Sequence, residues 1–158
     1  MILVAVDGSP PARAAEKVAL QLAAATGKPL GVVAVWKELT ADFGIPVSLV
    51  FEDAAEIERE WAQRMAAAAE AVAHDVGVEA EKIIRHGSPG KEICAAARER
   101  DAELIVIGSH GWGAVGGALF GSVSSYVLHH APCPVVVVRG DGSAEAGDGD
   151  GDRAAAHG

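Results

Sequence analysis

Four residues of this chain, three glycines and a serine, have the types and the spacing that could hold a phosphate group. They are Gly108, Gly111, Gly121 and Ser122, and they follow the apolar run Ile105–Ile107. Glycine has no Cβ, so its backbone can approach an anion closely. The N–H groups at a helix start carry partial positive charge, and a helical pattern begins near Ser122. We therefore expect these four residues to hold the phosphates of a nucleotide.

The composition indicates one acidic globular domain. The chain has 158 residues, 50% of them hydrophobic, which is enough for one sizeable core. It carries 22 acidic and 13 basic residues, a formal net charge of -9. Sequence-independent nucleic-acid binding needs clustered lysine and arginine, and anionic membrane surfaces attract basic segments. We therefore expect neither nucleic acid nor a membrane as a partner.

The cysteines and the apolar segments favour a cytoplasmic protein. Cys94 and Cys133 lie far apart in the sequence and form no CxxC motif. We interpret both as reduced thiols, although two cysteines do not exclude a disulfide. No secretory signal pattern precedes the first apolar run, and no stretch is apolar enough to span a bilayer.

Five short apolar runs alternate with helical patterns along the chain. Runs without polar alternation are typical of parallel strands that are buried on both faces. Because parallel crossovers are right-handed, this order predicts an α/β fold: an open, doubly wound sheet with helices on both faces. The predicted strands are Ile2–Val6, Leu30–Trp36, Lys82–His86, Leu104–Ile107 and Val135–Val138.

The longest predicted helix runs from about Glu52 to His74. Large and small apolar residues recur in it at steps of four and three, which predicts a stripe that faces the core. This stripe consists of Ile57, Trp61, Met65, Ala68 and Val72. For Trp61 and Met65 we prefer core packing to a role in ligand binding.

The strand order predicts where the site lies. Ligands of open α/β sheets bind at the carboxyl ends of the strands, where the winding reverses. In the order 3-2-1-4-5, the first and fourth strands are neighbours at that point, and they end at Asp7 and Gly108. Asp7 should therefore lie beside the glycine-rich loop. It could equally cap the turn that it opens, through Ser9 or Pro10.

The last residues differ in composition from the rest. Residues 140–158 are mainly glycine, alanine and aspartate, without a large apolar side chain. Such a segment cannot offset the entropy lost on ordering, so we expect a disordered acidic tail after a single domain at residues 1–139.

Together, four segments resemble the universal stress protein family. They are the opening Val4-Ala-Val-Asp-Gly-Ser9, the segment His86–Pro89, the pattern Gly108-x2-Gly111-x9-Gly121-Ser122, and the closing His130–Arg139. The resemblance covers residues 1–139. It implies a Rossmann-like fold, a homodimer and a role in stress survival. It also implies binding of ATP, ADP or AMP together with Mg²⁺ or Mn²⁺, as in members that keep this glycine signature.

The same resemblance implies roles for individual residues. Asp7 and its neighbours would contact the ribose and adenine side, the backbone near Val35 would meet the base, and the glycine loop with Ser122 would hold phosphates. The full set expected to bind nucleotide is Ala5, Val6, Asp7, Val35, Gly108, Ser109, Gly111, Gly121, Ser122 and Val123. No residue is assigned as catalytic or as a metal ligand. We interpret His110 as a loop-shaping residue rather than a base.

The sequence of the last predicted strand indicates how two copies of the chain pair. Four consecutive valines on an edge strand invite aggregation unless they are paired or covered. Isologous pairing is the usual solution, so we expect a homodimer through residues 134–139.

Three functions remain open from the sequence. The first is a nucleotide-binding regulatory module. The second is a slow ATPase or autophosphorylating enzyme, with Ser122 or Ser124 as the acceptor. The third is a dimeric scaffold without a ligand. Catalysis of phosphoryl transfer needs groups that hold developing charge, and residues 112–120 contain no lysine or arginine. We therefore favour the binding module, with charge balanced by backbone N–H groups and a divalent cation.

Overall fold

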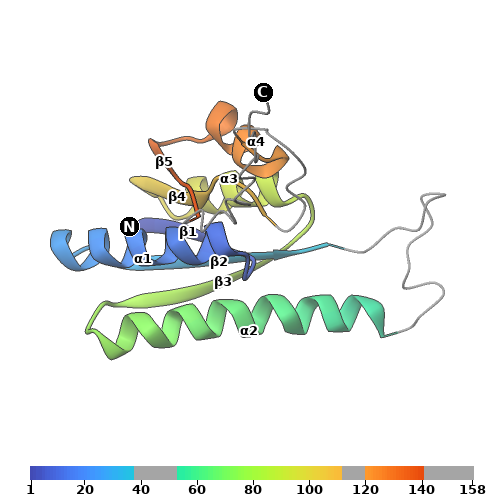
Figure 1. The fold of residues 1–158 in the computed structure, drawn as a ribbon, viewed down its shortest axis with the longest axis horizontal. Coiled ribbons are helices and arrows are strands. Elements are labelled where there is room, and N and C mark those ends of the chain that lie inside the picture. Colours follow the sequence, from blue (N-terminus) through green and yellow to red (C-terminus); the bar gives the residue numbers. More distant parts are fainter. Residues whose placement is uncertain (38–52, 112–119, 141–158) are drawn as a thin grey trace, which may run out of the picture.

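The computed structural model describes residues 1–37, 53–111 and 120–140. They form a five-stranded parallel sheet in the order β3-β2-β1-β4-β5 with helices on both faces (Figure 1), which confirms the predicted fold class. The elements are β1 Ile2–Val6, α1 Pro10–Thr26, β2 Leu30–Trp36, α2 Ala54–Asp75, β3 Ala80–His86, α3 Pro89–Glu99, β4 Leu104–Gly108, α4 Ser122–His130 and β5 Val135–Val138. The expected disordered tail, from residue 141 on, lies outside the described residues.

β1 is the central strand of this sheet, and it fixes the register of its neighbours. Val4 lies opposite Val32 of β2 on one side and Val106 of β4 on the other. β3 begins two residues earlier than the sequence predicts, because Ala80 and Glu81 already pair with β2. Since all strands run in parallel, their carboxyl ends meet along one edge of the sheet.

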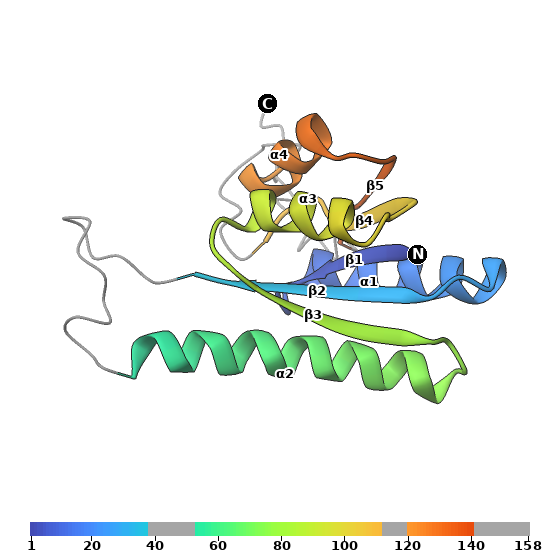
Figure 2. The ribbon, with the colours of Figure 1, turned by 180° about the vertical axis from the view of Figure 1, so that it is seen from behind.

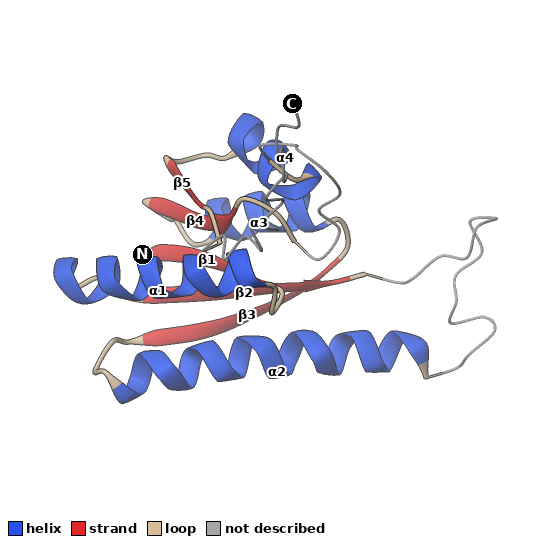
Figure 3. Cartoon of the chain, in the orientation of Figure 1, coloured by secondary structure: helices blue, strands red, loops and turns tan. Residues whose placement is uncertain are grey.

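The sheet is a single twisted layer that separates two apolar cores (Figure 3). Alternate residues of each strand point to opposite faces. On one face Val4 and Val32 pack against alanines of α1 and α2, and Ala19 of α1 is one of these alanines. On the other face Leu3 and Ile105 pack against α3 and α4, which lie together above the sheet (Figures 1 and 2). Both faces are therefore covered, as the continuous apolar runs require.

α2 packs through a different face from the one the sequence predicts. The exposed fractions are 59% for Ile57, 45% for Trp61 and 54% for Val72, so these three residues of the predicted stripe lie largely outside the core. Met65 is partly buried and packs against the core, as expected. The helix is instead buried through Ala62, Ala66 and Ala73. Small side chains let a helix approach a sheet closely, and this alanine face follows the same helical period as the large residues.

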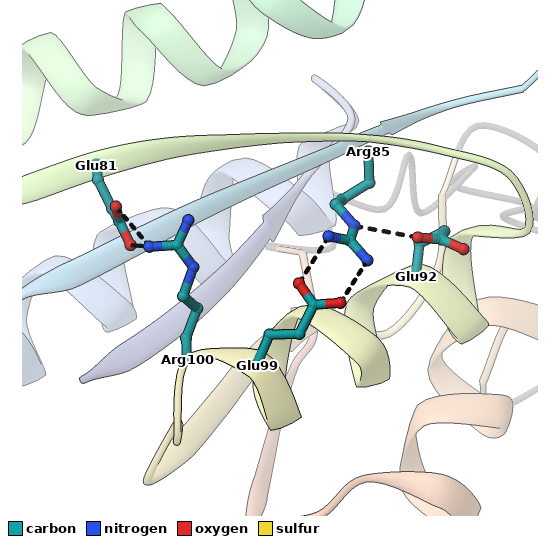
Figure 4. Close-up of polar contacts among 5 residues, drawn as sticks. All are labelled: Glu81, Arg85, Glu92, Glu99 and Arg100. Atoms are coloured by element: carbon teal, nitrogen blue, oxygen red, sulfur yellow. Dashed lines mark hydrogen bonds and ion pairs between the residues drawn. The ribbon is translucent and has the colours of Figure 1, made fainter.

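The edge strand β3 is held to α3 by ion pairs (Figure 4). Arg85 of β3 lies 3.1 Å from a Glu92 oxygen and 2.8 Å from a Glu99 oxygen. Arg100, just after α3, lies 2.7 Å from Glu81. The hydrogen bond from Arg85 holds the pKa of Glu99 below its usual value. Charged side chains of this kind also disfavour unwanted pairing at a sheet edge.

None of the helices in the described part of the chain combines the length and the apolarity that are needed to cross a membrane.

Candidate functional site

A pocket of about 400 Å³ opens at the carboxyl ends of β2, β1 and β4. The starts of α3 and α4 close it from above, through residues such as Pro89 and Ser122. This is the place where the winding of the sheet reverses, since the chain goes from β1 to β2 on one side and to β4 on the other. Open α/β sheets bind their ligands at this position.

All of the predicted site residues except Ser109 line this pocket. They are Ala5, Val6, Asp7, Val35, Gly108, Gly111, Gly121, Ser122 and Val123. Ser109 is only 3% exposed, and its main chain holds the loop instead. Its N–H donates to the Val138 carbonyl at 2.7 Å, and its carbonyl accepts from the Gly121 N–H at 2.7 Å. The fold thus brings together residues that are more than a hundred positions apart.

The start of α4 faces the pocket with open N–H groups. Gly121 is its N-cap, and no described side chain caps this helix. The first helical hydrogen bond runs from the Ser125 N–H to the Gly121 carbonyl at 2.9 Å, so the preceding N–H groups have no helical acceptor. In α1, by contrast, the Ser9 side chain accepts a hydrogen bond from the Ala12 N–H. The exposed start of α4 therefore provides partial positive charge for an anion.

Each glycine of the motif has a different neighbour. A Cβ on Gly108 would lie 2.7 Å from the carbonyl carbon of Pro11, so this glycine lets the start of α1 pack against β4. A Cβ on Gly111 would lie 2.8 Å from Oδ2 of Asp7. A Cβ on Gly121 would meet nothing closer than 3.4 Å. Gly108 therefore has a packing role that the phosphate interpretation did not include.

Asp7 caps the turn that it opens and also lies beside the glycine loop. Its Oδ1 accepts a hydrogen bond from the Ser9 N–H at 2.9 Å, so the carboxylate caps the turn before α1. Its other oxygen lies toward Gly111 on the pocket side. Burial raises the pKa of nearby Glu16, with Arg13 opposing this shift and the Asp7 charge adding to it. One carboxylate is thus fixed between the glycine loop and the strand ends.

The structure adds lining residues that the sequence analysis had not assigned. Val33 of β2 could have been found by alternation, because it shares the strand face of Val35, and Lys37 directly after β2 continues the same alternation. Ile93 and Ile107 add apolar surface suited to the flat face of a base. His110, which had been interpreted as shaping the loop, also lines the pocket. The added residues are Ala12, Val33, Lys37, Pro89, Ile93, Ile107, His110 and Ser124.

The hydroxyl and imidazole groups of the site are held by the loop. Ser124 is 2% exposed, and its hydroxyl donates to the Ser109 carbonyl at 2.8 Å. The Nδ1 atom of His110 lies 3.1 Å from the Ser109 hydroxyl oxygen. Within the described residues, no group of three or more His, Cys, Asp or Glu side chains could hold a metal ion. Trp112 and the rest of the loop to residue 119 lie outside the described residues.

Comparison with known proteins identifies relatives of this chain. The sequence pattern of the universal stress protein family matches residues 1–139. A universal stress protein from Thermus aquaticus is 40% identical over 139 residues, which is 87% of this chain and 97% of the relative. The universal stress protein YxiE from Bacillus subtilis is 34% identical over 145 residues, with the same coverage of 87% and 97%.

Solved structures of universal stress proteins share the fold. The protein from Lactobacillus plantarum superposes with a TM-score of 0.76 at 27% identity, over 87% of this chain and 96% of that one. A universal stress protein in complex with cAMP gives a TM-score of 0.66 at 25% identity, over 88% and 96%. The protein from Archaeoglobus fulgidus in complex with dAMP gives 0.60 at 27% identity, over 87% and 95%. In sequence pattern, sheet order and relatives alike, this chain belongs to the universal stress protein family.

Proposed function

We propose that this protein binds ATP or a related adenine nucleotide, ADP or AMP, and acts as a regulatory module in the response to stress. The observation that carries the proposal is the uncapped start of α4, which opens into a pocket that also contains a carboxylate and an apolar wall. Relatives with the same fold have been solved with cAMP and with dAMP, which are both adenine nucleotides.

The chemistry of the pocket suggests one orientation for the nucleotide. The N–H groups of the first turn of α4, from Ser122 on, suit a phosphate, because they are partly positive and no described side chain caps them. The Asp7 carboxylate lies directly after β1 and accepts hydrogen bonds, so it suits the ribose hydroxyls. The apolar wall of Val35 and Ile93 suits the base. This orientation agrees with the roles that the family resemblance implies.

A divalent cation, Mg²⁺ or Mn²⁺, would enter this site with the nucleotide. Mg²⁺ is usually held by phosphate oxygens, waters and one or two carboxylates, and does not need a complete protein cage. Because the proposed orientation uses Asp7 for the ribose, phosphate oxygens and waters would supply the ligands of this cation.

Binding with regulation fits these residues better than catalysis. The buried Ser124 hydroxyl already donates to a carbonyl, which disfavours it as a phosphate acceptor. Ser122 is exposed and remains the better acceptor, but His110 is the only described lining residue that could serve as a neutral base. We therefore expect at most slow ATP hydrolysis or autophosphorylation.

Isothermal titration of the purified protein with ATP, ADP and AMP, each with and without Mg²⁺, tests this proposal. We expect saturable one-site binding of at least one of these nucleotides. CTP is the control, because a pyrimidine covers less of the apolar wall while carrying the same phosphates. Heats at the background level for all three adenine nucleotides would favour the ligand-free scaffold instead.

We also propose a homodimer through β5 and the residues beside it, 134–139. β5 is an edge strand of the sheet, and all four of its valines keep part of their surface exposed. Val136→Lys would place a charge in the pairing surface, so we expect a monomer in light scattering where the wild type is a dimer. Val72→Lys, on the exposed side of α2, is the control and should stay dimeric. A wild type that is monomeric at micromolar concentration would contradict this assembly.

A further inference from the structure

One histidine lies at the end of the pocket where the phosphate is expected. His110 lines the pocket, shortly after the last residue of β4. A Cβ built on Gly121, the N-cap of α4, would lie 3.4 Å from the Cα of His110. The main chain is tied together here, because the carbonyl of Ser109 accepts from the Gly121 N–H at 2.7 Å. Since only one carbon separates a histidine ring from its Cα, the imidazole stays close to the start of α4.

The contact that holds the imidazole of His110 suits two protonation states. Its Nδ1 atom lies 3.1 Å from the hydroxyl oxygen of Ser109, and this serine is buried. A hydroxyl group both donates and accepts, so the contact persists whether or not Nδ1 carries a proton. Protonation of the ring therefore requires no rearrangement of this contact, and it adds a positive charge beside the first N–H groups of α4.

His110 is the lining residue that can bring a positive charge to this end of the pocket. Among the described lining residues, Asp7 is the only carboxylate, and the only lysine, Lys37, lies at the other end, beside Val35, where the base is expected. The first turns of α4 carry no charged side chain. The other charged residues of the elements that meet at this edge are Arg13 and Glu16 of α1, Lys91 and Glu92 of α3, and Arg139 after β5.

We propose that protonated His110 attracts the phosphate held at the start of α4, so that this residue makes nucleotide binding tighter as the pH falls from about 8 to about 6. This inference rests on the proposed nucleotide binding. Histidine is the side chain whose charge ordinarily changes within this pH range. By linkage, a phosphate that binds better to the protonated ring also favours protonation of the ring, so binding should be accompanied by proton uptake.

The expected effect is set by Coulomb attraction near the surface. For a partly exposed pair of charges that lie closer together than the Debye length, this attraction corresponds to about fivefold in affinity, and it falls as salt is added. The contribution of His110 should therefore be present at the lower pH and lost at the higher pH. Adenosine, which has no phosphate, should bind equally well with either form of the ring.

The test compares His110→Gln with the wild type by isothermal titration of AMP, ATP and adenosine at about pH 6 and about pH 8. A nucleotide phosphate can also gain a proton in this range, and burial raises the pKa of Glu16 from its usual value. The informative quantity is therefore the ratio of the wild-type affinity to the variant affinity at each pH, in which these contributions cancel. For AMP and ATP we expect a ratio of about five at the lower pH and near one at the higher pH. For adenosine we expect a ratio near one throughout.

Two further variants and one further readout separate charge from loop structure. His110→Lys keeps its positive charge at both pH values, so it should bind AMP more tightly than the wild type does at the higher pH. His74→Gln is the control, because His74 is an exposed histidine in the last turn of α2, at the opposite edge of the sheet. Titrations in two buffers of different ionisation enthalpy measure proton uptake, which should be smaller for His110→Gln than for the wild type and for His74→Gln.

Each other result has a defined meaning. A loss of affinity in His110→Gln that is the same at both pH values would overturn the role of the ring charge, and so would equal losses for adenosine and AMP. Affinities and proton uptake that match the wild type would overturn it as well. All three outcomes would leave the proposed nucleotide binding standing. If the wild type bound neither AMP nor ATP at either pH, both proposals would be overturned.

Discussion

Gly108→Ala is expected to destabilise the folded protein by about 2–3 kcal/mol, within the range found when extra carbon atoms are forced into well-packed interiors. A Cβ at this position would lie 2.7 Å from the carbonyl carbon of Pro11 and 2.8 Å from the nitrogen of Ala12. Both atoms belong to the backbone of the first turn of α1. They cannot move aside as a flexible side chain can, so α1 must shift relative to β4.

Urea unfolding, followed by circular dichroism, measures this effect as a lower midpoint with an unchanged slope. Gly121→Ala is the matched control. Its added Cβ would meet no atom closer than 3.4 Å, and its backbone already has a negative φ of -76°. Gly121 is the N-cap of α4, where alanine is less favourable than glycine, so we expect this control to lose no more than about 1 kcal/mol. Equal stability of the two variants would show that Gly108 is not required for the packing of α1.

The fold could be predicted from the sequence because its strongest signals are local. Runs such as Ile2–Val6 and Leu30–Trp36 are apolar without interruption, and buried parallel strands require this. The handedness of the crossovers then leaves few possible strand orders. The start of β3 was missed because Ala80 and Glu81 carry no such signal. They are in the strand only because β2 offers them hydrogen-bond partners.

The orientation of α2 could not be predicted because hydrophobic size gave the wrong face. Ile57, Trp61 and Val72 form an apolar stripe with a correct helical period, yet more than two-fifths of each side chain is exposed. Periodicity shows that a helix has faces, but it does not show which face the sheet accepts. Here α2 buries alanines such as Ala66 completely, while Met65 is the one large residue of the stripe that packs against the core.

The candidate site was predicted in position but not in detail. Strand order alone places Asp7 beside the glycine loop, because the ends of β1 and β4 are adjacent. The packing role of Gly108 depends on how closely α1 approaches, which no sequence pattern specifies. Lys37 was missed because it follows the last residue of β2, in a region where glycine and proline suggested only a loop. Strand alternation carried past Trp36 would have found it.

Gly111→Ala is expected to lower the affinity for the bound nucleotide about tenfold, through Asp7 rather than through the backbone. The added Cβ would lie 2.8 Å from Oδ2 of Asp7. The other oxygen of this carboxylate is held by the Ser9 N–H at 2.9 Å, so the group cannot turn away without losing that hydrogen bond. A displaced carboxylate no longer meets the ribose in the proposed complex, and a lost hydrogen bond of this kind costs roughly 1–2 kcal/mol.

A double-mutant cycle separates this indirect effect from direct obstruction of the pocket. Asp7→Ala alone should lower nucleotide affinity to a similar degree, because it removes the same contact with the ribose. In Asp7→Ala/Gly111→Ala the colliding oxygen is gone, so the second substitution should add almost nothing to the first. Isothermal titration with ATP measures all four corners of the cycle. Strictly additive losses would mean that the methyl group blocks the ligand itself, and that the close approach of Gly111 to Asp7 does not serve to position the carboxylate.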